Sequence, residues 1–230
     1  MNTTRTVVFF LFWVALLADC FLIIFQMTDY RIYTKTLLAP LILIGIYLDG
    51  INTKHTRSKL IANGAFFFCF LGDIILLKDY IGTNFISGLI CFLIAHVFFI
   101  VFFYRLKHFT ARHIIFNLIT ALFIMAYLGV LLLFVWRNVS LQNFELPITV
   151  YSIVLGCMVL TAINTVKNRT TKKLAVKYFI PGAIFFALSD SLLAINKFYS
   201  SFNYSSVIIM LTYGIAIFLL GNGIMRFLKK

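Results

Sequence analysis

Leu118–Trp136 reads LITALFIMAYLGVLLLFVW, a run of 19 residues without a charged side chain. A helix needs about 20 such residues to cross the roughly 30 Å of hydrocarbon in a bilayer. Apolar runs recur along the chain, for example at Val7–Phe25 and Val207–Leu220. Hydrophobic residues make up 62% of the 230 residues and charged residues only 12%, against about 25% charged in a soluble domain. The sequence therefore predicts an integral membrane protein.

Charged or turn-forming breaks divide these apolar runs into eight expected helices. The connections are short and polar, so residues 1–230 are expected to form a single transmembrane domain. Its predicted fold class is all-α, an eight-helix membrane bundle. The expected spans are residues 7–25, 33–49, 59–77, 84–104, 114–136, 146–166, 175–196 and 205–226.

The net charge of +13 could indicate a nucleic-acid ligand. In membrane proteins, however, Lys and Arg gather in short cytoplasmic loops beside anionic headgroups. The division into eight spans puts 15 of the 20 basic residues on the side of the two termini. The other side holds Arg31, Lys35, Lys78, Arg137 and Lys197. We therefore expect no nucleic-acid partner, and both termini in the cytoplasm.

Two of the spans share a pattern that predicts an internal repeat. The third contains Phe68–Leu76, FCFLGDIIL, and the seventh contains Phe185–Leu193, FFALSDSLL. The offset of 117 residues equals four helices, so the two copies run in the same direction. A four-plus-four tandem duplication would set Asp73 and Asp190 at matching depths, as pseudo-symmetric partners.

The acidic residues inside the spans are the main candidates for a functional site. Asp73 and Asp190 lie several residues inside their helices with apolar neighbours. Inserting an acidic residue into the membrane near a helix centre costs about 2.5–3.5 kcal/mol. Because of this cost, an acid inside a membrane span is taken as a functional site by default. The alternative is a structural pair that hydrogen-bonds Ser or Asn. Asp19 lies closer to a helix end and is either part of the site or a support for it.

Further polar residues point to the same region. His96 lies mid-span, and the repeat would place Tyr213 opposite it. Lys35 could snorkel as an anchor, pair with one of the acids, or hold a lipid phosphate. Asn196 is either a helix terminator or a headgroup contact. In the predicted orientation these residues converge on a cavity open to the non-cytoplasmic leaflet, whose natural ligand is a lipid.

Several chemistries find no support in the sequence. Zinc needs three or four protein ligands. One intramembrane His and two Asp at dispersed positions give little support for such a site. Neither a GxSxG elbow nor a P-loop is present. Two buried carboxyl groups suit acid–base chemistry, because one of a desolvated or close pair can keep its proton near neutral pH. We therefore expect no metal and no cofactor.

These residues resemble the YhhN family of membrane proteins, whose characterised members are lysoplasmalogenases. The resemblance lies in Gly72–Leu76, in Phe85–Leu89 leading to His96, in Tyr151, and above all in Gly182–Phe198. Lys35 is similar to a lysine in the family's second helix. The sequence departs from the family at Thr36, Phe99 and Ile217, where Pro, Tyr and Gln are often found, and this concerns substrate positioning.

The resemblance implies hydrolysis of the vinyl-ether bond of a lysoplasmalogen to a fatty aldehyde and a glycerophospho-ethanolamine or -choline. It implies Asp73 and Asp190 as the catalytic pair, with His96 orienting water or a carboxylate. Lys35, Tyr151, Asn196, Tyr213 and Asp19 are then candidates for substrate binding. The expected partners are the lysophospholipid substrate and membrane lipids, in a bacterial inner membrane.

The alternative function is a transporter that uses the same aspartates as a proton or cation relay. Transporters often show inverted repeats and broken helices at the midplane. Here the suspected repeat is parallel, and only Pro181-Gly182 suggests a break. Hydrolysis is therefore the favoured interpretation.

Overall fold

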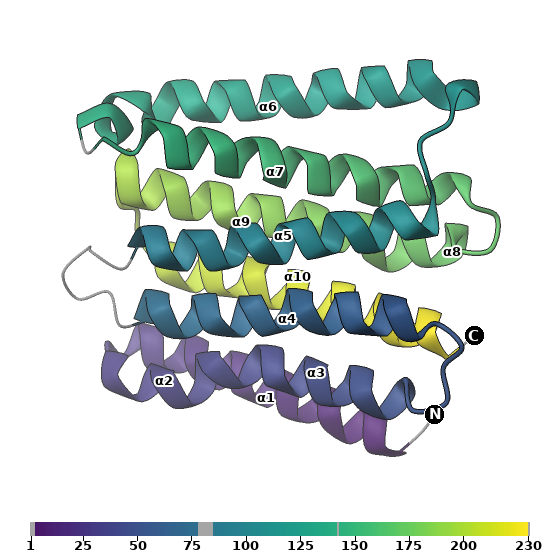
Figure 1. Ribbon diagram of the computed structural model, residues 1–230. Helices are drawn as coiled ribbons and strands as arrows, with labels where there is room; N and C mark the ends of the chain where they lie inside the picture. Colours follow the sequence, from purple (N-terminus) through teal and green to yellow (C-terminus); the bar gives the residue numbers. More distant parts are fainter. Residues whose placement is uncertain (1–2, 78–84, 142, 230) are drawn as a thin grey trace.

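The computed structural model describes residues 3–77, 85–141 and 143–229. Within these residues it is helical, without strands, and eight segments are long and apolar enough to cross a membrane. Figure 1 shows them as a layered bundle. The elements are α1 (Thr3–Ile24), η1 (Thr28–Tyr30), α2 (Arg31–Thr34), η2 (Lys35–Leu37), α3 (Leu38–Asp49), α4 (Thr56–Leu77), α5 (Phe85–Leu106), η3 (Ala111–His113), α6 (Ile114–Leu141), α7 (Glu145–Asn164), η4 (Thr165–Lys167), α8 (Lys172–Leu174), η5 (Ala175–Phe179), α9 (Ile180–Phe198) and α10 (Ser205–Leu228).

The structure confirms the all-α fold class and the eight predicted spans. Their bounds differ mainly at two places. The second span begins at Thr28, earlier than predicted, and the fifth continues to Leu141, because the helix does not stop at Arg137. Three charged residues used in the loop assignments, Lys78, Asp79 and Lys230, lie outside the described residues.

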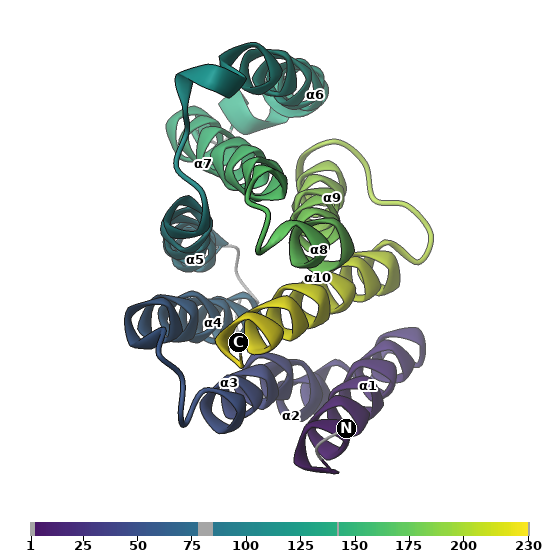
Figure 2. The ribbon, with the colours of Figure 1, turned by 90° about the vertical axis from the view of Figure 1, so that its right-hand side faces the viewer.

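The last helix, α10, forms the centre of the bundle. In its most apolar window 61% of the residues are buried, against 11% in the segment that contains α6. α10 packs against α1, α3 and α9, whereas α6 packs on the outside against α7 and α9 (Figure 2). The central helix therefore joins the two halves of the chain, together with the contact between α5 and α7.

Glycines let α10 approach its neighbours closely. A Cβ at Gly214 would lie 2.5 Å from Leu16 Cδ1, and one at Gly221 would lie 2.5 Å from Ile42 Cγ2. Small residues at such contacts are a common means of packing helices in membranes, where lipid gives no hydrophobic drive between them.

Two prolines interrupt the helical hydrogen bonding near the site. Pro40 cannot donate to the carbonyl of Thr36, and the chain just before it forms the 3₁₀ turn η2. Pro181 likewise cannot donate to the carbonyl of Lys177, which lies in the π-helical segment η5. The first of these interruptions places Lys35 at a turn beside α4.

Both termini lie at the same end of the bundle (Figure 1), as an even number of spans requires. Asp19, Asp73 and Asp190 each lie in the C-terminal half of a helix that runs away from this end. The three acids therefore lie toward the opposite end of the bundle.

Candidate active site

A cavity of about 240 Å³ opens among α2, η2, α4, α5, α9 and α10, and we call it the main cavity. Asp73 and Asp190 both line it, so the structure brings the two predicted catalytic acids to one space. Polar and apolar side chains both line its wall. Its polar residues are Arg31, Lys35, Asp73, Ser189, Asp190, Asn196, Lys197, Ser206 and Tyr213.

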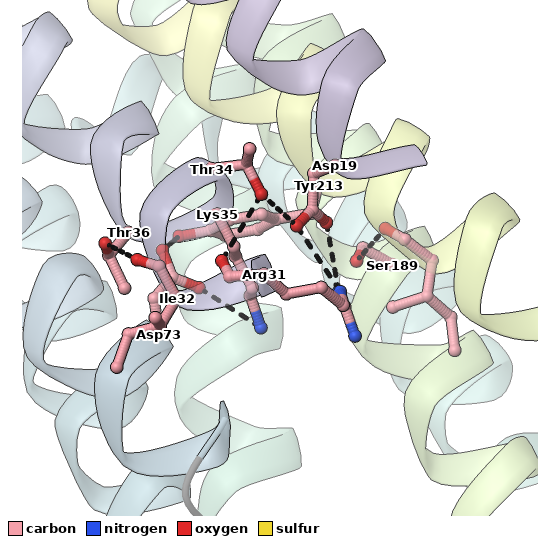
Figure 3. Close-up of polar contacts among 10 residues, drawn as sticks. Asp19, Arg31, Ile32, Thr34, Lys35, Thr36, Asp73, Ser189 and Tyr213 are labelled. Atoms are coloured by element: carbon pink, nitrogen blue, oxygen red, sulfur yellow. Dashed lines mark hydrogen bonds and ion pairs between the residues drawn. The ribbon is translucent and has the colours of Figure 1, made fainter. Parts of the chain in front are cut away.

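Asp73 is held between a cation and a phenol. Lys35 Nζ lies 3.5 Å from its Oδ1, and the Tyr213 hydroxyl donates a 2.7 Å hydrogen bond to its Oδ2 (Figure 3). Only 1% of the Asp73 side chain is exposed. Lys35 comes from η2, at the turn before Pro40, and Tyr213 from the central helix α10. The carboxylate therefore ties three segments of the chain together.

Asp190 has neighbours without a permanent charge. The Tyr151 hydroxyl donates a 2.6 Å hydrogen bond to its Oδ2, and His96 Nε2 lies 3.7 Å from the same oxygen. The Asp190 side chain is 13% exposed, which makes it the more accessible of the two acids to a ligand. Tyr151 lies on α7 and His96 on α5, so this carboxyl is surrounded from different helices.

His96 lies behind Asp190 and is not among the residues that line the main cavity. Its side chain is completely buried, and neither ring nitrogen has a hydrogen-bond partner among the described residues. The ring packs edge-on against Phe186, with centroids 4.7 Å apart, and against Tyr151. This geometry suits an effect on the carboxyl of Asp190 better than direct contact with a ligand.

Asp19 is buried outside the main cavity and binds a residue that lines it. Arg31 donates from Nε to Oδ1 at 3.3 Å and from Nη2 to Oδ2 at 3.0 Å. Thr34 Oγ1 donates to Oδ1 at 2.7 Å, as Figure 3 shows. The sequence left open whether Asp19 is part of the site or supports it. This arrangement fits a supporting role, in which Asp19 positions Arg31.

Asn196 and Lys197 line the main cavity near the end of α9. The Oδ1 atom of Asn196 is buried without a hydrogen-bond partner among the described residues. Lys197 Nζ lies 5.2 Å from the centre of the Phe85 ring, a cation–π distance. Both side chains are therefore placed to meet a polar ligand.

A smaller pocket of about 40 Å³ adjoins the main cavity, and we call it the apolar pocket. It lies among α5, α6, α7 and α9 and is lined chiefly by Leu, Phe, Ile and Val side chains. Asp190, Leu76, Phe85, Phe92 and Leu193 line both spaces. Asp190 thus stands at the boundary between an apolar and a polar chamber.

Sequence reasoning did not assign Arg31, Lys197, Ser189 or Ser206 to the site. A signal was present for the two cations. Arg31 precedes Lys35 by four residues, and Lys197 follows Asp190 by seven, which are spacings that share a helix face. For the two serines no signal stood out, because isolated serines are common in membrane helices.

These features define a class, the multi-pass helical membrane proteins with two carboxyl groups on one intramembrane cavity. Residues 30–224 match the model of the YhhN family, and the chain belongs to that family. Comparison with curated proteins and with solved structures found no match. Apart from Asp19, every residue assigned to the site lies in the matched region.

Proposed function

We propose that this protein is an intramembrane hydrolase that cleaves the vinyl-ether bond of lysoplasmalogens. The products are a fatty aldehyde and glycerophospho-ethanolamine or -choline. The observation that carries the proposal is the position of Asp190 between the apolar pocket and the polar main cavity. A lysoplasmalogen has the same order, with an alkyl chain, then the vinyl ether, then a polar glycerophosphate.

The different neighbours of the two acids suggest their roles. Asp73 has the ammonium of Lys35 at 3.5 Å, so we assign it as the ionised carboxylate. Asp190 has a phenol and an imidazole as neighbours and is the more exposed of the pair. We therefore assign Asp190 as the proton donor, since the donor must touch the substrate carbon.

The reaction then has three steps. Asp190 gives its proton to the alkenyl carbon remote from the ether oxygen, which leaves an oxocarbenium ion. The Asp73 carboxylate stabilises this cation and takes a proton from the water that adds to it, as paired carboxylates do in glycoside cleavage. The hemiacetal moves its hydroxyl proton to the glycerol oxygen as the C–O bond breaks, and Asp73 returns its proton to Asp190 through the main cavity.

The remaining proposed roles follow from this arrangement. His96 and Tyr151 position Asp190, and Tyr213 and Lys35 position Asp73. Asn196 contacts the polar part of the substrate. The charge asymmetry supports an orientation with both termini in the cytoplasm, and therefore a main cavity toward the opposite leaflet. We propose the inner membrane of a bacterium as the location.

The direct test is aldehyde release by the purified protein. We expect aldehyde from a lysoplasmalogen and no fatty acid from the ester lysophospholipid of the same chain length, because the ester has no alkenyl carbon that can be protonated. No aldehyde from the wild-type protein would contradict the proposal. Proton flux in liposomes, measured on the same preparation, would favour transport instead if Asp190→Asn abolished it.

A further inference from the structure

We propose that Arg31, positioned by Asp19, recognises the phosphate group of the lysophospholipid. This inference rests on the proposed function and names the part of the site that selects a phospholipid. It assigns a role to the ion pair that joins α1 to the wall of the main cavity.

The guanidinium of Arg31 is fixed along one edge. Its Nε and Nη2 atoms bind the two oxygens of Asp19, a carboxylate with no exposed side-chain surface. Thr34 holds the same carboxylate with a third hydrogen bond. A buried partner that orients a functional side chain removes much of the conformational freedom that binding would otherwise cost.

The rest of the guanidinium is available to the main cavity. Arginine carries five N–H donors in a planar fork, and Asp19 takes up two of them. The Arg31 side chain is 17% exposed and lines the main cavity. In Figure 3 one of its nitrogens points away from Asp19. A planar fork of this kind matches two oxygens of a phosphate.

The charge of the cavity wall favours an anion near Arg31. Among the residues that the structure describes, three cations line the main cavity, and of these Lys35 is paired with Asp73. Lys197 lies over the Phe85 ring, and no carboxylate among the described residues forms an ion pair with it. Arg31 and Lys197 together thus offer a phosphodiester both a bidentate donor and a second positive charge.

The position of Arg31 also agrees with the order of groups in the substrate. Arg31 lines the main cavity and is absent from the apolar pocket, whereas Asp190 lines both. With the first carbons of the alkyl chain in the apolar pocket and the vinyl ether at Asp190, the phosphate would lie in the main cavity. The bond that the two acids cleave would then lie between the apolar pocket and Arg31.

The test compares two alkenyl substrates, a lysoplasmalogen and the 1-alkenylglycerol that lacks the phosphate. We expect wild-type protein to prefer the phospholipid in kcat/KM, and Arg31→Gln to reduce that preference about 10- to 100-fold, through KM, as the loss of a charge-assisted hydrogen bond predicts. Arg31→Lys, which keeps the charge but loses the fork, should lie between the two. Arg137→Gln, at an exposed residue of α6 outside both chambers, is the matched control and should keep the preference.

Asp19 should act only through Arg31. Asp19→Asn alone is expected to weaken the preference, and adding it to Arg31→Gln should reduce the preference no further. Equal losses on both substrates in Arg31→Gln and Arg31→Lys would overturn the inference, because a structural role does not distinguish them.

A binding measurement separates this inference from the hydrolase proposal. A saturated 1-alkyl ether lysophospholipid cannot be hydrolysed by this chemistry, so its affinity is measured directly. Weaker binding to Arg31→Gln, with unchanged binding to Arg137→Gln, would support phosphate recognition even if wild-type protein released no aldehyde. Equal affinity for wild type and Arg31→Gln would overturn it even in an active enzyme.

Discussion

Asp73 on α4 and Asp190 on α9 both line the main cavity, yet the side chains around them differ in charge. Asp73 faces the ammonium of Lys35 and the phenol of Tyr213. Asp190 faces the phenol of Tyr151 and the imidazole of His96. Two carboxyl groups of the same kind can take different parts in one reaction when their neighbours differ in this way.

The partners of the two acids correspond along the chain. Asp190 and Tyr213 follow Asp73 and His96 by 117 residues, and Tyr151 follows Lys35 by 116. Each acid takes one partner from the preceding span and one from the last span of the other half. The tandem duplication stays a prediction, and this exchange of partners is compatible with it.

The largest loss of activity is expected when either carboxyl group is removed. Asp190→Asn and Asp73→Asn should each lower kcat for aldehyde release about 10²- to 10⁴-fold, as expected for loss of a general acid or base. Asparagine keeps the size of the side chain, so the bundle should still fold. Steady-state kinetics on detergent-purified variants measures this, and full activity in either variant would refute the assigned roles.

Removing the lysine tests the charge difference itself. Lys35→Met leaves the Asp73 carboxylate without its cation. Losing one partner of a buried ion pair lowers the free energy of unfolding by about 3–5 kcal/mol. We expect kcat to fall at least about tenfold, since each 1.4 kcal/mol of transition-state stabilisation is worth that factor. His96→Phe, which removes a neighbour at 3.7 Å without a hydrogen bond, should cost less. The reverse order, measured in the same assay, would mean that Asp190 depends on a charged histidine.

Removing either of the two phenol hydroxyls should have a smaller effect, and the two effects on stability should differ. Tyr213→Phe and Tyr151→Phe each delete one hydrogen bond to a carboxyl group, worth about 1.5–3 kcal/mol when the acceptor is charged. Because we assign the charge to Asp73, thermal unfolding should show the larger destabilisation for Tyr213→Phe. Tyr47→Phe, at an exposed ring outside both chambers, is the control. A larger destabilisation in Tyr151→Phe would reverse the assignment of the ionised acid.

Hydropathy and loop charge were enough to predict the eight spans, since the bilayer demands long apolar helices. The same demand made Asp73 and Asp190 conspicuous, because an acid in hydrocarbon needs a reason. Arg31 was less visible, because the short segment that contains it looked like the outer end of a helix. Its importance depends on Asp19 being buried beside it, a contact between α1 and α2 that no local pattern encodes.

The position of His96 was also beyond the sequence. Its depth in α5 was predicted, but whether it faced a ligand or a carboxyl group depended on how α5, α7 and α9 pack. The tyrosine contacts could not be predicted either, because Tyr213 binds Asp73, which lies 140 positions away in the sequence. Such pairings follow from the packing of the whole bundle.

Proton donation to the alkenyl carbon is tested most directly by hydrolysis of a lysoplasmalogen in D₂O. The aldehyde is trapped as it forms and analysed by mass spectrometry. Proton donation to the alkenyl carbon predicts one deuterium at the carbon next to the aldehyde group. Where this proton transfer limits the reaction, the wild-type rate is also lower in D₂O. An aldehyde released without deuterium would contradict protonation by the aspartate pair.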